Sequence, residues 1–120
     1  MEWRVEVTEG FAAWWAGLSE NEQDDICASA LILSQCGPYP RFPLSSWVND
    51  SKHRTMRELR LRSGGNPFRL LYGFDPKRVA MLLIGGEKGG RRRAYPACIA
   101  MADRLYALHL EELRGEELQQ

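Results

Sequence analysis

The stretch MRELRLRSGGNPFRLLYGFDPKRVAMLLI, residues 56–84, decides the fold. Near its start, Leu59 and Leu61 alternate with charged residues, which is the period-2 pattern of a half-buried strand. Gly64-Gly65-Asn66-Pro67 follows, and this composition predicts a turn. The first part of the stretch therefore reads as a strand that ends in a tight reversal of the chain.

The second part of the stretch continues the same pattern. Every second residue from Phe68 to Phe74 is large and apolar, so these side chains share one face of a strand. Asp75-Pro76-Lys77-Arg78 suits a type I turn with proline at its second position. The nearly continuous apolar run Val79–Ile84 is typical of a central strand that is covered on both faces. Together the two parts predict an antiparallel meander of three strands.

One strand and a helical hairpin are expected before the meander. Alternating apolar residues at 3, 5 and 7 predict a first strand, and a helical pattern follows over residues 11–18. Ser19-Glu20-Asn21-Glu22 reads as a capping box at the start of a second helix, which Gly37-Pro38 ends. Its buried stripe is expected to comprise Ile26, Cys27, Ala30, Leu31 and Leu33.

The remaining segments complete an α+β fold. Residues 37–55 are rich in proline, serine, asparagine and aspartate, so an irregular connection is expected there. Residues 99–113 return to helical spacing and predict a last helix. We therefore expect one domain over residues 1–120, with an antiparallel sheet and helices packed on it.

Composition sets further limits on the class of protein. The longest apolar run is far shorter than the roughly 18 residues that a membrane span requires, and the chain begins without a signal pattern, so a cytoplasmic protein is expected. The three cysteines, Cys27, Cys36 and Cys98, are an odd number with no close pair, and we interpret them as reduced core residues.

The charges are strongly segregated along a chain whose formal net charge is zero. Residues 1–36 carry a net charge of −6, residues 37–93 carry +9, and residues 94–120 carry −3. Most of the bases in the middle segment are arginines, which bind phosphate groups well. The middle segment is therefore predicted to bind a phosphate backbone, although an ordinary solvated face would show the same charge.

Four short segments resemble a known family. They are MRELR (residues 56–60), FRLLYGFDP (68–76), LLIGGEK (82–88) and IAMADRLYALHL (99–110). Their order and spacing resemble the phage-derived, HigB-like branch of the RelE/HigB-like toxin superfamily, over residues 3–113. The resemblance implies a RelE-like fold and a toxin of a type II toxin–antitoxin pair. It also implies a metal-independent endoribonuclease that cleaves mRNA, at the ribosome or free, and is silenced by a cognate helix-turn-helix antitoxin.

The candidate site residues come from the basic middle segment. Arg60 and Arg69 lie on neighbouring predicted strands and point away from the apolar sets, so they could clamp one phosphate. Lys88 and Tyr95 are the candidates for proton transfer, since RNA cleavage by its own 2′-hydroxyl needs a base and an acid. The candidates for RNA binding are Arg57, Arg62, Arg91, Arg92, Arg93 and His53.

Each of these residues also has a simpler interpretation. Arg60 could form an ion pair with neighbours of Glu58 or with the acidic helices, Lys88 could be merely exposed, and Tyr95 could cap the last helix. The sequence departs from the resembled family after Glu87-Lys88, where glycines and three arginines replace a tryptophan-rich stretch, so base stacking depends on Tyr95 alone. No spacing of His, Cys, Asp and Glu indicates a metal site, and no cofactor is expected.

Two other functions remain open at this stage. A protein of the same fold could poison DNA gyrase without cleaving anything, because a fold alone does not fix a target. The chain could also be a phage accessory protein that keeps only the fold.

Overall fold

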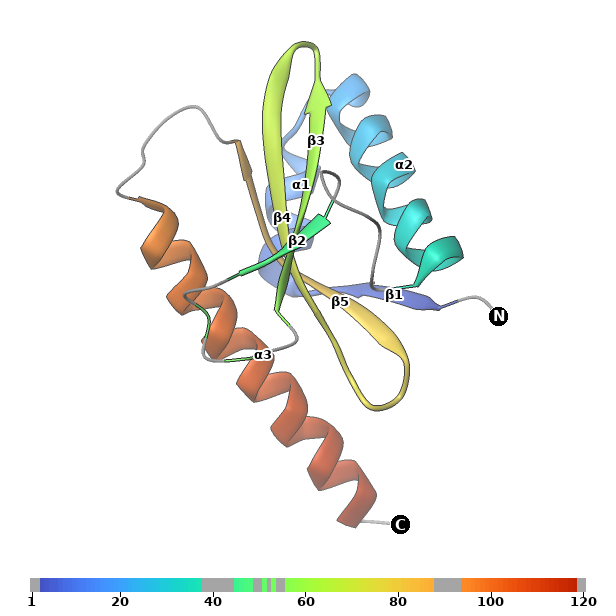
Figure 1. The fold of residues 1–120 in the computed structure, drawn as a ribbon, viewed down its shortest axis with the longest axis vertical. Helices are drawn as coiled ribbons and strands as arrows, with labels where there is room; N and C mark the ends of the chain where they lie inside the picture. Colours follow the sequence, from blue (N-terminus) through green and yellow to red (C-terminus); the bar gives the residue numbers. More distant parts are fainter. Residues whose placement is uncertain are drawn as a thin grey trace.

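The fold is seen in a computed structural model, which describes residues 3–37, 45–48, 51, 53, 56–87 and 94–118. For residues 45–47, 87, 94–97, 117 and 118 it describes the backbone alone. The elements along the chain are β1 (Arg4–Val7), α1 (Glu9–Ala16), α2 (Glu20–Cys36), β2 (Ser45–Trp47), β3 (Arg57–Ser63), β4 (Asn66–Phe74), β5 (Val79–Glu87) and α3 (Ala94–Leu118). Figure 1 shows their arrangement.

The strands of the described chain form one mixed sheet in the order β1-β5-β4-β3-β2. β3, β4 and β5 pair antiparallel in sequence, so the predicted meander is confirmed. Its first turn places Gly64 and Gly65 at φ values of 58° and 83°. This left-handed backbone is easily reached by glycine and is typical of tight β-hairpins.

Two strand pairings differ from the prediction. β1 pairs with β5 in parallel, so the sheet is mixed and not purely antiparallel. β2 lies inside the segment expected to be irregular, and its three residues pair antiparallel with β3. A period-2 pattern identifies the face that a strand buries, but it does not specify the neighbouring strand or its direction. A three-residue strand is also too short to show the pattern at all.

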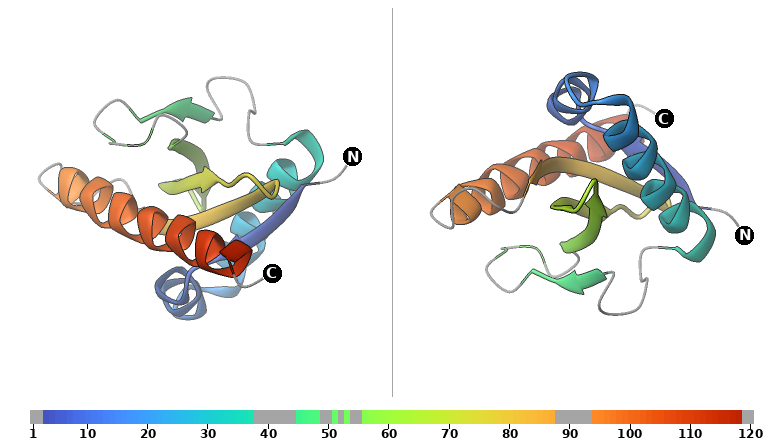
Figure 2. Two further views of the ribbon diagram at one scale, coloured as in Figure 1. Left: turned by 90° about the horizontal axis from the view of Figure 1, so that it is seen from below. Right: turned by 90° about the horizontal axis from the view of Figure 1, so that it is seen from above.

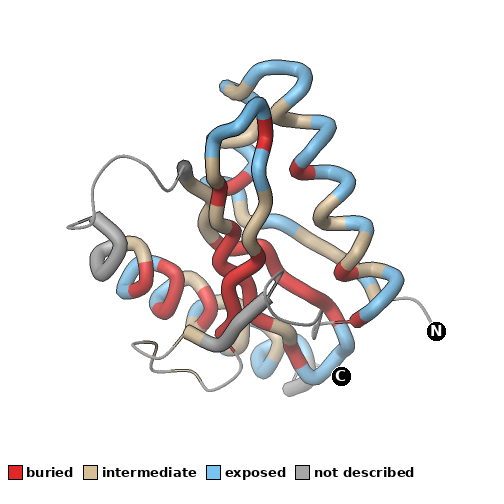
Figure 3. Tube along the Cα trace, turned by 45° about the horizontal axis from the view of Figure 1, so that its top comes forward, coloured by how far each residue is buried: buried red, intermediate tan, exposed pale blue. Residues whose placement is uncertain are grey.

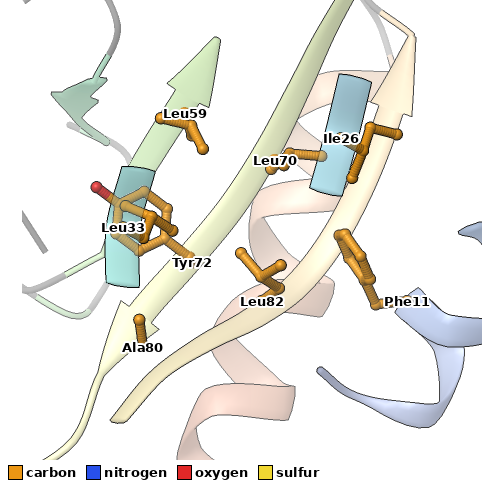
Figure 4. Packing of buried hydrophobic residues seen from close by; sticks show 8 residues of the cluster. All are labelled: Phe11, Ile26, Leu33, Leu59, Leu70, Tyr72, Ala80 and Leu82. Carbon is orange, nitrogen blue, oxygen red and sulfur yellow. The ribbon is translucent and has the colours of Figure 1, made fainter. Parts of the chain in front are cut away.

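Apolar side chains cover both faces of the sheet. On one face, Phe11 of α1 and two buried residues of α2 pack against the strands; this cluster is Phe11, Ile26, Leu33, Leu59, Leu70, Tyr72, Ala80 and Leu82 (Figure 4). On the other face lie Met56, Leu71, Met81, Leu83, Ile99, Ala102 and Tyr106, of which the last three belong to α3. Figure 2 shows the helices around the sheet from two directions. β5 contributes to both clusters, which confirms that it is a central strand.

The helical hairpin forms largely as expected. Ser19 and Glu22 make the predicted capping box, and Trp15 and Gln23 exchange hydrogen bonds between the two helices. The predicted stripe of α2 is wrong at two positions, because Cys27 and Leu31 are exposed. α2 contacts the sheet through a narrow line at Ile26 and Leu33, so the residues beside that line face outward.

The cysteines are free, and their predicted core role is largely wrong. Cys36 is exposed like Cys27, whereas Cys98 is half-buried beside the cluster under α3. None of the helices in the described part of the chain is long and apolar enough to cross a membrane.

Candidate nucleic-acid interface

Arg60 and Arg69 lie directly opposite each other on β3 and β4. Their neighbours Leu59 and Leu70 are buried in the cluster under α1 and α2. Because successive side chains of a strand point to opposite faces, both arginines project from the face that carries α3. The alternation predicted this convergence, and the structure shows it.

Glu58 lies between the two arginines and contacts both. Its Oε1 accepts a hydrogen bond from Arg60 Nε at 2.8 Å. Arg69 Nε lies 3.1 Å from the same oxygen, in an ion pair whose N–H is not aligned as a hydrogen bond. The Glu58 side chain is only 5% exposed, so this carboxylate is a buried counter-charge. Arg60 does form an ion pair, but its partner is Glu58 itself and not one of the expected partners, the neighbours of Glu58 or the acidic helices.

The three arginines on this face, Arg60, Arg62 and Arg69, are here called the basic face. The Arg60 side chain is 40% exposed and that of Arg69 is 19% exposed, while Arg62 is exposed near the hairpin turn. The buried part of the same sheet face starts at Leu71, where α3 packs. In Figure 3 the strands are mostly buried in the middle of the sheet, and more of their positions are intermediate or exposed toward the β3–β4 turn. The basic face is thus the part of the sheet that α3 leaves accessible.

Beside the basic face, β5 presents a glycine, Gly86. Gly86 pairs in register with Arg69, and a Cβ built at Gly86 meets no described atom within 4 Å. The neighbouring Gly85 is different, because a Cβ there would collide with the ring of Trp14 on the opposite face. Packing among the described residues therefore explains Gly85 but not Gly86. Glycine within a strand can mark a place where a ligand approaches the backbone closely.

Arg57 does not belong to this face, and its role in RNA binding stays a prediction. It is only 6% exposed, and it pairs in register with Tyr72, a buried member of the cluster under α1 and α2. Arg57 lies one residue before Glu58, so alternation turns its side chain to the opposite side of the sheet. A ligand on the basic face could not reach it.

His53 is held against α3 and not in the basic face. Its ring packs edge-on against that of Tyr106, with the ring centroids 4.7 Å apart. Its Nε2 lies 3.3 Å from the backbone oxygen of Asp103. The Ser51 hydroxyl donates to the Asp103 carboxylate and accepts from the His53 N–H. These contacts attach the segment before β3 to the last helix. Only a tautomer protonated on Nε2 would donate to that carbonyl, which leaves Nδ1 as an acceptor.

The other predicted residues cannot be placed. Lys88, Arg91, Arg92 and Arg93 lie outside the described residues. Tyr95 lies in the first turn of α3, but its side chain also lies outside them. Their roles in proton transfer and RNA binding stay predictions.

Sequence reasoning missed the position of Glu58 between the two arginines. The signal was present, since this is the acid of the Arg57-Glu58-Leu59-Arg60 segment and alternation puts it on the same face as Arg60. Another acid–base contact lies just after β4, between Asp75 Oδ2 and His109 Nε2 at 2.7 Å. Within the described residues, no three His, Cys, Asp or Glu side chains gather closely enough to hold a metal ion.

Comparisons with known proteins identify the family of the chain. Residues 13–107 match the model of a family described as "Phage derived protein Gp49-like". The chain belongs to this phage-derived family. It is 37% identical to the protein of Mycobacterium tuberculosis named as toxin HigB2, over 92% of the chain and 55% of that protein. It is 36% identical to HigB3 of the same organism, also named as a toxin, over 75% of the chain and 78% of that protein.

These relatives make the chain a member of the HigB-like family. It spans little more than half the length of HigB2. The fold matches that of a mutant of the Escherichia coli toxin RelE in its free state with a TM-score of 0.62, over 83% of this chain and 95% of RelE, at 14% identity. Other solved structures with this fold are toxin–antitoxin complexes. The α+β class and the RelE-like topology are thereby confirmed.

Proposed function

We propose that this Gp49-like protein is the toxin of a type II toxin–antitoxin pair and that it cleaves mRNA without a metal. The observation that carries the proposal is the opposed pair Arg60 and Arg69, held together on an accessible part of the sheet. The relatives named as toxins support the class of function, and the geometry supports the chemistry.

The two guanidiniums suit the charge that develops during RNA cleavage. The 2′-oxygen attacks the adjacent phosphorus, the bond from phosphorus to the 5′-oxygen breaks, and a 2′,3′-cyclic phosphate and a 5′-hydroxyl result. A base takes the proton of the 2′-hydroxyl, and an acid returns one to the leaving oxygen. Arg60 and Arg69 would bind the phosphoryl oxygens as negative charge gathers on them, in the way that other preorganised donors stabilise transition states.

Lys88 and Tyr95 remain our candidates for proton transfer, and Arg91, Arg92 and Arg93 for contacts with the RNA backbone. All five precede or begin α3, so they follow directly on β5, the strand that pairs with Arg69. The proposed substrate is mRNA on the ribosome, which places the action of the toxin in the cytoplasm.

The proposed partner is a cognate antitoxin of the helix-turn-helix type. Solved proteins of this fold occur in complexes with antitoxins, which supports a protein partner here. A toxin that attacks mRNA must be masked in the cell that makes it, and the basic face is the surface that masking would have to make harmless.

The test compares Arg69 with a matched arginine of the same face. Arg69→Ala should abolish growth inhibition and lower the rate of mRNA cleavage by about 10²–10³-fold, because one preorganised donor is lost. Arg69→Lys should restore little, since lysine cannot reproduce the planar fork of the guanidinium. Arg62→Ala, at an exposed position near the turn, should weaken RNA binding only moderately.

Cleavage is read by mapping new 5′ ends within open reading frames, with circular dichroism as the control for folding. Full activity in a folded Arg69→Ala protein would remove this residue from the mechanism. Intact mRNA together with accumulating DNA breaks would instead favour a gyrase poison.

A further inference from the structure

We infer that Glu58 is a positioning residue, which holds Arg60 and Arg69 as one preformed site for a single phosphate group. This inference rests on the proposed cleavage of RNA. It concerns the one acid among the described residues for which contacts with both arginines of the pair are seen.

Arg60 and Arg69 bring two positive charges close together. Residues directly opposite each other in an antiparallel pair have Cβ atoms only about 4.5–5.5 Å apart, and like charges at such positions destabilise the sheet. Arg60 and Arg69 occupy such positions, so their guanidiniums would otherwise diverge. Glu58 offsets the repulsion, because it lies on the same strand face two residues before Arg60 and diagonally across from Arg69.

Glu58 also bears on the direction of the two side chains. Both arginines approach the same oxygen of Glu58, and both do so through Nε, at 2.8 and 3.1 Å. The Arg60 Nε–H donates a hydrogen bond to this oxygen, which orients the plane of its guanidinium, whereas Arg69 is attracted to the same oxygen by charge. The shared carboxylate therefore brings the two guanidiniums to one point of the sheet, where a phosphate could be bound from both sides.

Packing alone does not account for an acid here. Glu58 pairs in register with Leu71, which is 2% exposed, so an apolar residue would fit its surroundings. Burying a carboxylate costs free energy even when it is paired, and apolar replacements of buried ion pairs are often neutral or stabilising. The acid is better explained by what it does to the arginines.

Glu58 itself is not assigned a catalytic role. Its side chain is 5% exposed, and the oxygen that faces the site already contacts two guanidiniums. A substrate hydroxyl would have to displace them to reach it. Glu58 therefore acts through Arg60 and Arg69.

The test uses Glu58→Gln, with Glu6→Gln as the matched control. Glu6 also pairs with an arginine two residues away on its own strand, but that pair is exposed and lies on β1. Both substitutions raise the net charge by one. Single-turnover cleavage is measured on a 5′-labelled mRNA, free and on programmed ribosomes, and binding is measured with the same RNA carrying 2′-O-methyl riboses, which has no nucleophile.

We expect Glu58→Gln to lower the cleavage rate by about 10–10²-fold, because misplacement of a catalytic group by an ångström can cost this much. Its affinity for the methylated RNA should stay equal or rise, since an acid has been removed from a basic face. Glu6→Gln should leave both quantities unchanged. Equal cleavage by Glu58→Gln and the wild type, or a parallel loss of cleavage and binding in a folded variant, would overturn the inference.

A second measurement does not depend on activity. In the wild-type protein, NMR should show that the Nε–H proton of Arg60, which donates to Glu58, exchanges with water more slowly than that of the exposed Arg62. If the two protons exchange equally fast, Glu58 does not hold the pair, whether or not the protein cleaves RNA and whether or not Glu58→Gln folds. A wild type that cleaves neither free nor ribosomal mRNA would instead refute the proposed function.

Discussion

Two adjacent glycines of β5 should respond in opposite ways to the same substitution. A Cβ at Gly85 would lie 2.5 Å from Cη2 of Trp14 and still nearer to another atom of that ring, whereas a Cβ at Gly86 meets no described atom within 4 Å. Neither glycine has a positive φ, so alanine fits the backbone at both positions. The difference between the two variants therefore isolates the packing against Trp14.

The expected magnitudes follow from these contacts. The ring centroid of Trp14 lies 5.3 Å from that of Phe11 and 6.2 Å from that of Phe68. Trp14 can therefore move away from a new methyl group only by disturbing both rings. Overpacking of this kind costs about 1–3 kcal/mol, and we expect Gly85→Ala to lose at least that much of the free energy of unfolding. Gly86→Ala should instead gain about 0.4–1 kcal/mol, because alanine restricts the unfolded chain without straining the folded one.

Gly73→Ala tests the same kind of overpacking on the sheet face that carries α3. Its Cβ would lie 2.6 Å from Cε2 of Tyr106, whose hydroxyl donates to the backbone oxygen of Phe74. We expect a loss of about 2–4 kcal/mol, from overpacking together with a strained hydrogen bond. Urea unfolding, followed by tryptophan fluorescence and by circular dichroism, gives all three values. A Gly85→Ala protein as stable as the wild type, or a destabilised Gly86→Ala protein, would refute this reasoning.

Three further variants test other parts of the structure. Ser19→Ala should lower the free energy of unfolding by about 1 kcal/mol, because it removes the capping box of α2; thermal unfolding checks this. Asp75→Ala should lower the free energy of unfolding by about 2–4 kcal/mol, since its buried carboxylate accepts from the N–H groups of Lys77 and Val79 and contacts His109. His109→Gln, which keeps a donor, should lower it clearly less, and urea unfolding measures both values. Gly86→Leu should leave the fold intact but reduce mRNA cleavage, because its side chain would cover the surface beside Arg69; unchanged cleavage would show that no substrate approaches β5 there.

The meander could be predicted from the sequence because local signals determine it. Alternation in β3 and β4 identified the face of every residue, and Gly64 and Gly65 marked the turn. β1 carried the same kind of signal, yet its parallel pairing with β5 depends on how α1 and α2 cross the sheet. No local pattern encodes that path.

The candidate site was predictable to the extent that it depends on alternation. Arg60 and Arg69 were placed correctly for that reason, whereas Arg57 was assigned by charge alone and proved to be buried on the opposite face. His53 was chosen for its chemistry, and its position depends on contacts with Tyr106 and Asp103, about fifty residues away in the sequence. Tertiary contacts of this kind leave no periodic signal in the chain.

One face of the sheet forms part of the core near α3 and carries the candidate site toward the β3–β4 turn. The change occurs between two residues of β4 that are neighbours on this face. Leu71 is buried beneath α3, and two residues earlier Arg69 contacts Glu58 on the accessible part. Glu58 pairs in register with Leu71 and therefore lies at this boundary. Because it is buried like the core and charged like the site, its carboxylate can attract the guanidiniums through little intervening water, where such interactions are stronger than at an exposed surface.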